Sequence, residues 1–597
     1  MSGELFGPRL LPDGGVEFRL WAPAARQVDL VIAEPRPMTP AEDGWFKLAV
    51  SDAGPGTRYR FRIDGEQLVP DPASRYQPED VDGPSEVVAQ DFDWKASDWR
   101  GHPWGEAVFL ELHLGAFSKE GTYQGAMAHL DHLVETGITA IELMPLADFA
   151  GSRNWGYDGV LLYAPDSSYG RPEDLKALID AAHQRGLMVF LDVVYNHFGP
   201  KGNYLHQYAP DFFSRDHQTP WGGAIDYRVP QVRSFAIENA LYWLREFRFD
   251  GLRLDAVHAI RELGSPSVLE SLSHAVGRFA RQSGRHIHLV LENDDNAATL
   301  LNPAEDIPDG RYRAQWNDDY HHAWHVLLSG EQVGYYEDYA TAPQGFLERC
   351  LSGGFAYQGE VSAHRGGELR GEPTDALPST AFVNFLQNHD QIGNRPFGER
   401  LEALAPPEAI EAALAITLLL PMIPLLFMGE EWGARQPFPF FCDFSGDLAQ
   451  AVEEGRRREF APIYKSLPPG KDIPSALAES TFLSTKLDWS EPNGKGKARL
   501  QLVRHLLKMR QKFIAPRLKG HPQQSKDVRI KDGVAAGTWI LGDGSRLHLR
   551  ANLTGRETVA PSWPAGATAI WPVQESGQAD PSARLSPWSV VWLLEAV

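Results

Sequence analysis

The pattern of hydrophobic and polar positions divides the 597-residue chain into three parts. Residues 1–100 show short alternating stretches, for example at 16–22 and 59–63, which are separated by turns rich in Gly, Pro and Asp. Alternation over roughly four to eight residues is typical of strands that bury one face. The first part is therefore predicted to form an N-terminal β-sandwich domain.

From residue 101 to 515 the pattern changes to continuous apolar runs that alternate with amphipathic segments. The apolar runs predict strands at 108–114, 139–144, 188–194, 251–255, 287–292, 313–317, 381–386 and 423–428. The amphipathic segments predict helices that include 123–136, 172–185, 231–247, 266–282 and 499–513. Buried parallel strands that alternate with helices favour a closed (β/α)8 TIM barrel over an open doubly wound sheet. Two long insertions, near 330–372 and 435–495, interrupt this barrel.

The alternating pattern returns in residues 516–597, for example at 546–551 and 590–594. This part is predicted to form a small C-terminal antiparallel β domain. The predicted fold class is therefore α/β, with a TIM barrel as the catalytic domain between two β domains.

Charge and composition narrow the possible partners. The chain carries 57 Lys and Arg against 79 Asp and Glu, a net charge of −22. Such a surface repels nucleic acid and anionic membranes, so neither is expected as a partner. No apolar tract is long enough to span a bilayer, and no signal-peptide core is visible. Cys350 and Cys442 show no metal-ligand spacing, so unpaired thiols in a cytoplasmic protein are expected.

Three acids stand at or just beyond the ends of predicted strands, where barrel enzymes keep their catalytic groups. They are Asp255, Glu292 and Asp390. A single acid at such a place usually caps the next helix. Three that converge on one barrel mouth are harder to explain as caps, because clustered like charges cost folding energy. We therefore predict that they form a catalytic site.

An enzyme that cleaves a glycoside with retention of configuration needs two such carboxyl groups. One ionised carboxylate attacks the anomeric carbon and a second, protonated carboxyl donates to the leaving oxygen, with the two roughly 5–5.5 Å apart. Arg253, two residues before Asp255, would hold that carboxylate ionised. Glu292 ends an apolar strand, an environment that would raise its pKa towards that of a working acid. These residues predict a retaining α-glucoside hydrolase, with Asp390 as a third carboxylate that binds hydroxyls and stabilises positive charge.

Four segments resemble, in order and spacing, the signature regions of the α-amylase superfamily of glycoside hydrolases. They read DVVYNH from 192, GLRLDAVH from 251, HLVLE from 288 and FLQNHD from 385. The resemblance extends over residues 106–515 and implies Asp255 as nucleophile, Glu292 as general acid/base and Asp390 as transition-state stabiliser. It also implies that the bound sugar is contacted by His197, Arg253, His389 and Gln391, with Tyr157 stacking beneath it and Asp158 beside it.

Further segments are similar to one family within that superfamily, maltooligosyltrehalose trehalohydrolase. They are residues 154–159, 292–296, 315–322 and 334–339. The resemblance implies hydrolysis of the α-1,4 bond next to a terminal trehalose, which releases trehalose. Polar groups that match the turned trehalose ring are then expected at Trp221, His258, Asn317, Asp318, Asp319, Tyr320 and His321. For residues 317–321 a helix N-cap with acids in the first turn is the alternative.

Three other functions stay open at this point. A 1,4-α-glucan branching enzyme would use the same acids but transfer the glucan to a sugar hydroxyl, and a debranching hydrolase would cut α-1,6 bonds. A catalytically inert glucan-binding protein is the alternative outside the enzymes. The Asn-Asp-Asp-Asn sequence after Glu292 disfavours the branching enzyme, and the complete set of acids and histidines disfavours the inert protein.

Neither a cofactor nor a metal is expected. Asn196 matches a position linked to structural calcium in many α-amylases, but no acidic loop with calcium-like spacing lies nearby. The expected partners are maltooligosyl trehalose and related α-glucans, bound by a monomer.

Overall fold

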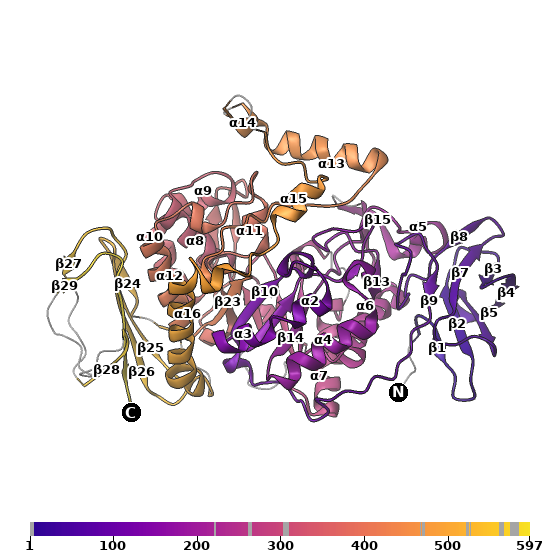
Figure 1. Ribbon diagram of the computed structural model, residues 1–597, viewed down its shortest axis with the longest axis horizontal. Coiled ribbons are helices and arrows are strands. Elements are labelled where there is room, and N and C mark those ends of the chain that lie inside the picture. Colours follow the sequence, from indigo (N-terminus) through magenta and orange to yellow (C-terminus); the bar gives the residue numbers. More distant parts are fainter. Residues whose placement is uncertain are drawn as a thin grey trace.

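The computed structural model shows a barrel between two β domains (Figure 1). The residues that it describes are 5–219, 222–260, 265–302, 310–465, 467–468, 472–520, 524–525, 527–559, 566–572 and 584–597. In Figure 1 the N-terminal domain lies on the right and the C-terminal sheet on the left of the barrel. The predicted fold class is confirmed.

Eight parallel strands close the barrel in chain order. They are β10 (Phe109–Leu112), β11 (Ala140–Leu143), β14 (Met188–Val193), β17 (Gly251–Leu254), β18 (His288–Leu291), β19 (Ala314–Trp316), β22 (Phe382–Asn384) and β23 (Ile423–Phe427). Every residue of these strands is buried, which explains their continuous apolar runs. The covering helices include α4 (Pro172–Gln184), α6 (Pro230–Glu246), α7 (Val268–Ser283), α8 (Asp318–Ser329), α12 (Pro407–Leu419) and α16 (Lys497–Met509).

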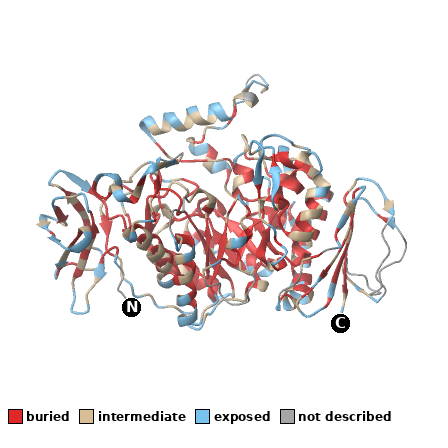
Figure 2. Ribbon diagram, turned by 180° about the vertical axis from the view of Figure 1, so that it is seen from behind, coloured by how far each residue is buried: buried red, intermediate tan, exposed pale blue. Residues whose placement is uncertain are grey.

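The interior of the barrel is filled with side chains. Phe109 and Phe190 meet edge to face with 4.8 Å between ring centroids, and Trp104 closes the amino-terminal end. Figure 2 shows the buried residues concentrated in this region. Since the interior is packed, the catalytic groups are confined to the rim at the carboxyl ends of the strands.

Two predicted helices differ from the structure. Segment 123–136 forms α2 (Tyr123–Met127) and α3 (Leu130–Thr136), because His129 leaves the helical conformation and stacks on Trp489 at 3.6 Å. After α16 the chain widens into a π-helical turn at Arg510–Ile514. This turn carries the buried Arg510 guanidinium to the backbone carbonyls of residues 418, 420 and 422.

The N-terminal domain consists of two antiparallel sheets. One has the order β1 (Arg9–Leu10), β2 (Val16–Trp21), β6 (Trp45–Val50), β5 (Thr39–Pro40). The other has the order β4 (Pro35–Pro37), β3 (Val28–Val31), β7 (Arg58–Ile63), β8 (Gln67–Val69), with β9 (Ser85–Glu86) also paired to β7. Phe18 of β2 contacts Tyr59 of β7 across the sandwich at 4.7 Å. Arg75 joins this domain to the barrel, with its guanidinium 4.2 Å from the centre of the Tyr242 ring.

The C-terminal domain is an antiparallel sheet. Its order is β24 (Arg529–Lys531), β25 (Val534–Ile540), β26 (Arg546–Asn552), β30 (Val590–Glu595), β28 (Thr568–Trp571), and a separate pair joins β27 (Thr558–Val559) to β29 (Arg584–Leu585). Trp592 of this sheet donates from Nε1 to the backbone carbonyl of Ala415 in α12, at 3.0 Å. The expected domain boundaries near 100 and 515 fall between β9 and β10, and between α16 and β24.

The two insertions form distinct structures. The first contains α9 (Glu337–Ala340), α10 (Pro343–Gly353) and a hairpin of β20 (Glu360–Ser362) and β21 (Glu368–Arg370). The second contains α13 (Gly446–Glu459), α14 (Ala461–Tyr464) and α15 (Glu479–Ser484), and α13 projects from the barrel without a buried residue (Figures 1 and 2). Shorter elements are α1 (Leu114–Phe117), α5 (Leu205–Tyr208), α11 (His389–Gly393), β12 (Ala147–Asp148), β13 (Leu161–Pro165), β15 (Phe213–Thr219) and β16 (Gly222–Ile225).

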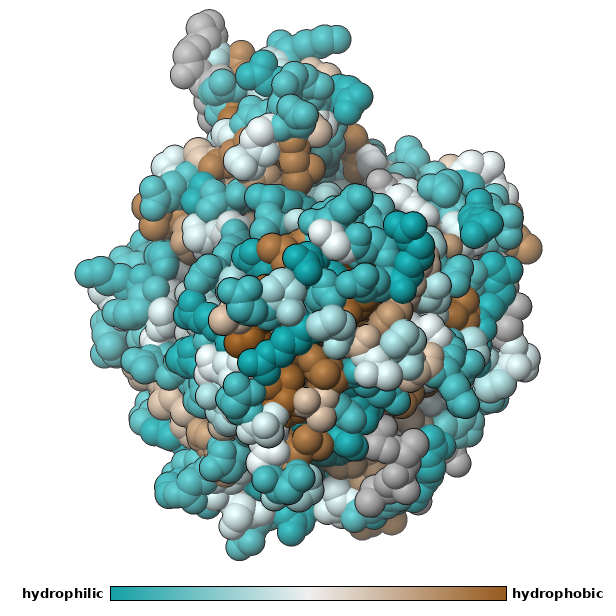
Figure 3. All heavy atoms as spheres, turned by 90° about the vertical axis from the view of Figure 1, so that its right-hand side faces the viewer, coloured by the Kyte–Doolittle hydropathy of each residue, from teal (hydrophilic) through white to brown (hydrophobic). Residues whose placement is uncertain are grey.

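The surface is mainly hydrophilic on the face that the N-terminal domain presents, with apolar side chains in small groups (Figure 3). Among the described helices, none combines the length and the apolar character that crossing a bilayer requires.

Gly251→Ala tests the packing of the barrel. A Cβ at this position would lie 2.1 Å from Cε1 of Phe190 and 2.4 Å from the backbone oxygen of His288. Overpacking of this kind typically costs about 1–3 kcal/mol, so thermal denaturation should show a lower Tm. Gly54→Ala is the matched control, because no atom lies within 4 Å of its Cβ position. Equal Tm values for the two variants would contradict the close packing around Gly251.

Candidate active site

The structure brings the three predicted acids together at the carboxyl ends of the barrel strands. Asp255 directly follows β17, Glu292 directly follows β18, and Asp390 lies in the first turn of α11, beyond β22. The side chains of Asp255 and Glu292 are largely buried, whereas that of Asp390 is 44% exposed. The first two carboxylates are therefore held by the protein, and the third is open to a ligand.

The guanidinium of Arg253 lies at the centre of the site and its side chain is 1% exposed. Nη1 donates to Oδ2 of Asp192 at 2.6 Å and to Oδ1 of Asp255 at 3.0 Å. Nη2 donates to Oε2 of Glu292 at 2.7 Å. The guanidinium carbon lies 4.2 Å from the centre of the Trp316 ring. One buried cation thus binds three carboxylates from three adjacent strands.

Asp255 is oriented from two sides. Nδ2 of Asn196 donates to its Oδ2 at 2.8 Å and to its backbone oxygen at 2.9 Å, and Arg253 binds the other carboxylate oxygen. Burial raises the pKa of Asp255, while the Arg253 guanidinium and the Asn196 amide oppose that rise. Asn196, the position linked by resemblance to calcium, here holds the carboxylate by hydrogen bonds.

Glu292 has the features of a general acid. Burial raises the pKa of its carboxyl above the ordinary value, and Arg253 opposes this rise. Its Oε2 accepts from Arg253 and from the backbone N–H of Ala256 at 2.8 Å, so Oε1 is the oxygen that remains to carry a proton. Ala256 adopts a left-handed conformation (φ 40°, ψ 50°) that residues with a Cβ seldom use. Such strain is typical of functional sites.

His389 provides a second positive charge, beside Asp390. Its Nδ1 is hydrogen-bonded to Oε1 of Glu111, and its backbone N–H donates to Oε2 of Glu111 at 3.2 Å. Burial lowers the pKa of His389, but the Glu111 carboxylate outweighs this effect and the pKa is raised to about 9. The ring is therefore cationic at neutral pH, with Nε2 3.9 Å from Oδ1 of Asp390.

Tyr157 joins these groups into one wall. Its ring stacks on His389 with 5.1 Å between centroids, and its hydroxyl donates to Oδ2 of Asp192 at 2.6 Å. Nε2 of His197 bonds to the backbone oxygen of Tyr157 at 2.9 Å. Asp158 follows, and its carboxylate accepts from the Asn154 amide at 2.7 Å. Tyr157, His197 and His389, three of the residues predicted to contact the sugar, therefore lie together in the structure.

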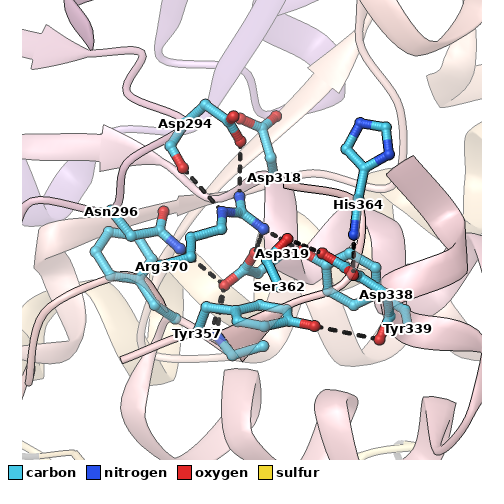
Figure 4. Close-up of polar contacts among 12 residues, drawn as sticks. Asp294, Asn296, Asp318, Asp319, Asp338, Tyr339, Tyr357, Ser362, His364 and Arg370 are labelled. Atoms are coloured by element: carbon cyan, nitrogen blue, oxygen red, sulfur yellow. Dashed lines mark hydrogen bonds and ion pairs between the residues drawn. The ribbon is translucent and has the colours of Figure 1, made fainter. Parts of the chain in front are cut away.

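A cavity of about 220 Å³ opens beside Glu292 and Asp390. Most of its lining residues have polar or charged side chains, and Figure 4 shows part of this wall. The other lining residues are His258, Asp294, Asp318, His322, Tyr335, Asp338, Tyr339, Ser362, His364, Arg365, Arg370, Gln391 and Asn394. The predicted residues His258, Asp318 and Gln391 are among them, and Gln391 donates from Nε2 to Oδ1 of Asp318 at 3.4 Å.

The polar segment 317–321 divides between the cavity and the interior. Asn317 caps α8 and its Nδ2 donates to Oδ1 of Asn384 at 2.9 Å. Asp319 is fully buried and accepts, among other bonds, a backbone N–H bond of 2.7 Å from Ala356. These two residues therefore hold the fold together, as the helix-cap alternative implies.

Tyr320 and His321 are also buried and bonded to the protein. The hydroxyl of Tyr320 bonds to Oγ1 of Thr417 at 2.8 Å, and Nδ1 of His321 bonds to the backbone oxygen of Leu386 at 2.5 Å. Within this segment only Asp318 lines the cavity. The structure therefore narrows the predicted sugar contacts of the segment to Asp318. Trp221 lies outside the described residues.

Sequence reasoning did not assign roles to several residues of this site. Asp192 and Glu111 are acids inside apolar strands, and that placement was the available signal. His364 and Arg370 come from the hairpin of the first insertion, and no pattern in the sequence connects that hairpin with the loop after Glu292.

Comparisons with known proteins agree with this geometry. The model of the α-amylase catalytic domain matches residues 92–222, that of carbohydrate-binding module 48 (isoamylase N-terminal domain) matches 5–80, and that of a domain of unknown function, DUF3459, matches 524–592. The malto-oligosyltrehalose trehalohydrolase of Deinococcus radiodurans is 46% identical over 84% of this chain and 82% of its own length. The protein of that name from Saccharolobus solfataricus is 41% identical over 81% and 83%. A crystal structure described as a putative α-amylase from Salmonella typhimurium has a TM-score of 0.92 and 44% identity, with 99% of both chains covered.

Glu111→Gln tests the charge of His389. Because the glutamate is what raises the pKa of this buried imidazole, the variant should titrate at or below the ordinary histidine value of about 6.5 instead of about 9. NMR of the protein labelled with ¹³C at histidine Cε1 would follow the titration. The resonance of His389 is assigned as the one that is absent from the spectrum of His389→Asn. A His389 signal that still titrates near 9 in Glu111→Gln would show that another group maintains the charge.

Proposed function

The chain belongs to the malto-oligosyltrehalose trehalohydrolase family, and we propose that it hydrolyses the α-1,4 bond next to the terminal trehalose of maltooligosyl trehalose, with retention of configuration. It is a glycoside hydrolase of the α-amylase superfamily. The observation that carries the proposal is the site itself. Asp255 and Glu292 share one buried guanidinium, and Glu292 also borders a polar cavity.

In the first step Asp255 attacks the anomeric carbon while Glu292 gives its proton to the glycosidic oxygen. The bond to the leaving trehalose breaks, and an ester forms between the anomeric carbon and Asp255. The raised pKa of Glu292 supports its role as the proton donor, and the two hydrogen bonds on Asp255 keep its carboxylate oriented for attack. Asp390, the most exposed of the three acids, is then available to bind ring hydroxyls.

In the second step Glu292, now ionised, takes a proton from water as the water attacks the anomeric carbon and the bond from this carbon to Asp255 breaks. Asp255 leaves as a carboxylate and the maltooligosaccharide is released with its original anomeric configuration. Arg253 contacts both carboxylates and is placed to stabilise either of them in its anionic form. The reaction needs no cofactor and no metal.

The cavity beside Glu292 is the side on which we place the trehalose. The leaving group is the part that receives the proton, and Glu292 lines this cavity whereas Asp255 and Tyr157 are not among its lining residues. Burial and the neighbouring Glu292 and Asp294 raise the pKa of Asp318, so its carboxyl can donate a hydrogen bond to a sugar. Asp294 lines the same cavity and is held in place by Arg365 and Arg370. A sugar that cannot reach the polar groups of this wall forms fewer hydrogen bonds, which is a basis for discrimination.

The same proposal includes the state of the protein. We propose that it acts as a monomer. The two cysteines are buried and unpaired, as expected of a cytoplasmic protein. The branching-enzyme and inert-protein alternatives have less support, because relatives named trehalohydrolases match over more than four fifths of the chain.

The direct test is to incubate the purified protein with maltotriosyltrehalose and, in parallel, with maltopentaose, and to follow the products by chromatography. We expect rapid release of trehalose from the first substrate and slow attack on the second. Longer or branched products would instead indicate a transferase. Equal hydrolysis of both would reduce the function to that of a general α-amylase, and no reaction with either would revive the inert protein.

Asp255→Asn and Glu292→Gln test the assigned roles. Loss of an acid/base group typically lowers the rate by about 10²–10⁴, so each variant should lose nearly all turnover while it still folds and binds substrate. Turnover is measured as trehalose release and binding by calorimetry. Glu408→Gln, at an exposed position at the start of α12, is the control and should retain the full rate. A variant with more than roughly a tenth of the wild-type rate would overturn the role of that acid.

A further inference from the structure

The hairpin β20–β21 inserts an arginine into the wall of the cavity (Figure 4). Arg370 is the last residue of β21 and its side chain is 4% exposed. Its Nε donates to the backbone oxygen of Asp294 at 2.9 Å, and Nη2 donates to Oδ1 of Asp294, also at 2.9 Å. The planar guanidinium thus binds both the backbone and the side chain of one residue, a geometry that a lysine cannot reproduce.

The remaining nitrogen of Arg370 binds a second segment. Nη1 lies 3.0 Å from Oδ1 of Asp319 and donates to the hydroxyl of Tyr339 at 2.7 Å. Asp319 also accepts from the Asn296 amide at 2.9 Å and from the backbone N–H of Tyr357 at 2.9 Å. Arg370 therefore joins the hairpin, the start of α8 and the loop that follows Glu292.

A second arginine of the same hairpin strengthens the contact with this loop. Nη1 of Arg365 donates to Oδ1 of Asp295 at 2.8 Å, and Nη2 donates to the backbone oxygen of Asp294 at 2.8 Å. Its side chain is 20% exposed. Arg370 is thus the more buried of the two and the one that links the loop to α8.

The loop transmits this arrangement to the cavity. The backbone N–H of Asp294 donates to Nδ1 of His258 at 3.2 Å. An imidazole nitrogen that accepts a hydrogen bond carries no proton, so the ring proton of His258 is on Nε2. His258 and Asp294 both line the cavity next to Glu292. The position of the loop therefore determines where a donor and an acceptor stand beside the general acid.

We propose that Arg370 is a positioning residue that sets the specificity for the trehalose end of the substrate. Through Asp294 it holds His258 and the loop after Glu292 in the arrangement that the leaving group meets. The proposal rests on the proposed function, because it assigns the cavity to the leaving trehalose. The competing explanation is that Arg370 only stabilises the fold. Removing one partner of a buried ion pair leaves the other charge uncompensated and strongly destabilises the folded protein.

The two explanations differ in what they do to substrate preference. In Arg370→Gln, Asp319 loses its cation and Asp294 keeps only Arg365, whose side chain is more exposed. We therefore expect the loop to shift relative to α8 while Asp255 and Arg253 keep their contact. We expect the ratio of kcat/KM for maltotriosyltrehalose to that for maltopentaose to fall at least tenfold. Most of the loss should lie in the KM for the trehalose-ended substrate. A purely structural role would lower both activities together and leave the ratio unchanged.

The control is Arg349→Gln, which removes an exposed ion pair between α10 and Glu360 of the same hairpin without touching the loop. Its ratio should match that of the wild type. Arg370→Lys retains the charge but not the planar fork and should show an intermediate ratio. If Arg370→Gln does not fold, Arg370→Lys becomes the test of the proposal. We then expect the ratio of the two kcat/KM values to fall at least threefold.

A folded Arg370→Gln, or failing that Arg370→Lys, with an unchanged ratio would overturn the proposal. The wild type in the same assay separates this outcome from a failure of the proposed function. If the wild type itself does not prefer maltotriosyltrehalose, the proposed function is wrong, and the inference that depends on it is withdrawn.

Discussion

The burial of one positive charge is the constraint on which the site depends. Arg253 is almost completely inside the protein, and a guanidinium there is stable only if oxygen acceptors bind it. Asp192, Asp255 and Glu292 meet this requirement from the adjacent strands β14, β17 and β18. Removing any strand from its register would therefore leave a buried charge without its partner. Fold and chemistry are coupled at this point, because the contacts that make the guanidinium stable also orient the proposed nucleophile and the proposed acid.

The barrel and the inserted segments contribute different parts of the site. The barrel strands position Asp255 and Glu292, the proposed catalytic pair, whereas the inserted hairpin and the loop after Glu292 supply part of the wall of the cavity. Strand ends are rigid, which suits reacting groups that need accurate placement. Inserted loops can change without disturbing the barrel, so they are suited to set which sugar is accepted. The two arginines of the hairpin give this loop-borne wall a rigidity that loops ordinarily lack.

Much of the fold could be predicted because its signals are local. Continuous apolar runs identify the barrel strands, and Asp255, Glu292 and Asp390 follow from the rule about strand ends. What could not be predicted depends on contacts between distant segments. Nothing in the sequence at 317–321 says that Asp319 and Tyr320 are directed inward while Asp318 borders the cavity. The helix expected at 123–136 breaks at His129, whose ring stacks on a tryptophan 360 positions further along the chain.

In the proposed mechanism the shared guanidinium has a consequence for how the proton affinity of Glu292 changes within one catalytic cycle. In the free enzyme the negative charge of Asp255 contributes to the raised pKa of Glu292. Formation of the ester on Asp255 removes that charge, and Arg253 then has one anion fewer to bind. Both changes favour the ionised form of Glu292, so its pKa falls when the second step requires a base and recovers when Asp255 is released. In the proposed mechanism the covalent state of Asp255 thus shifts the protonation equilibrium of Glu292, and electrostatics favours the alternation of its two roles.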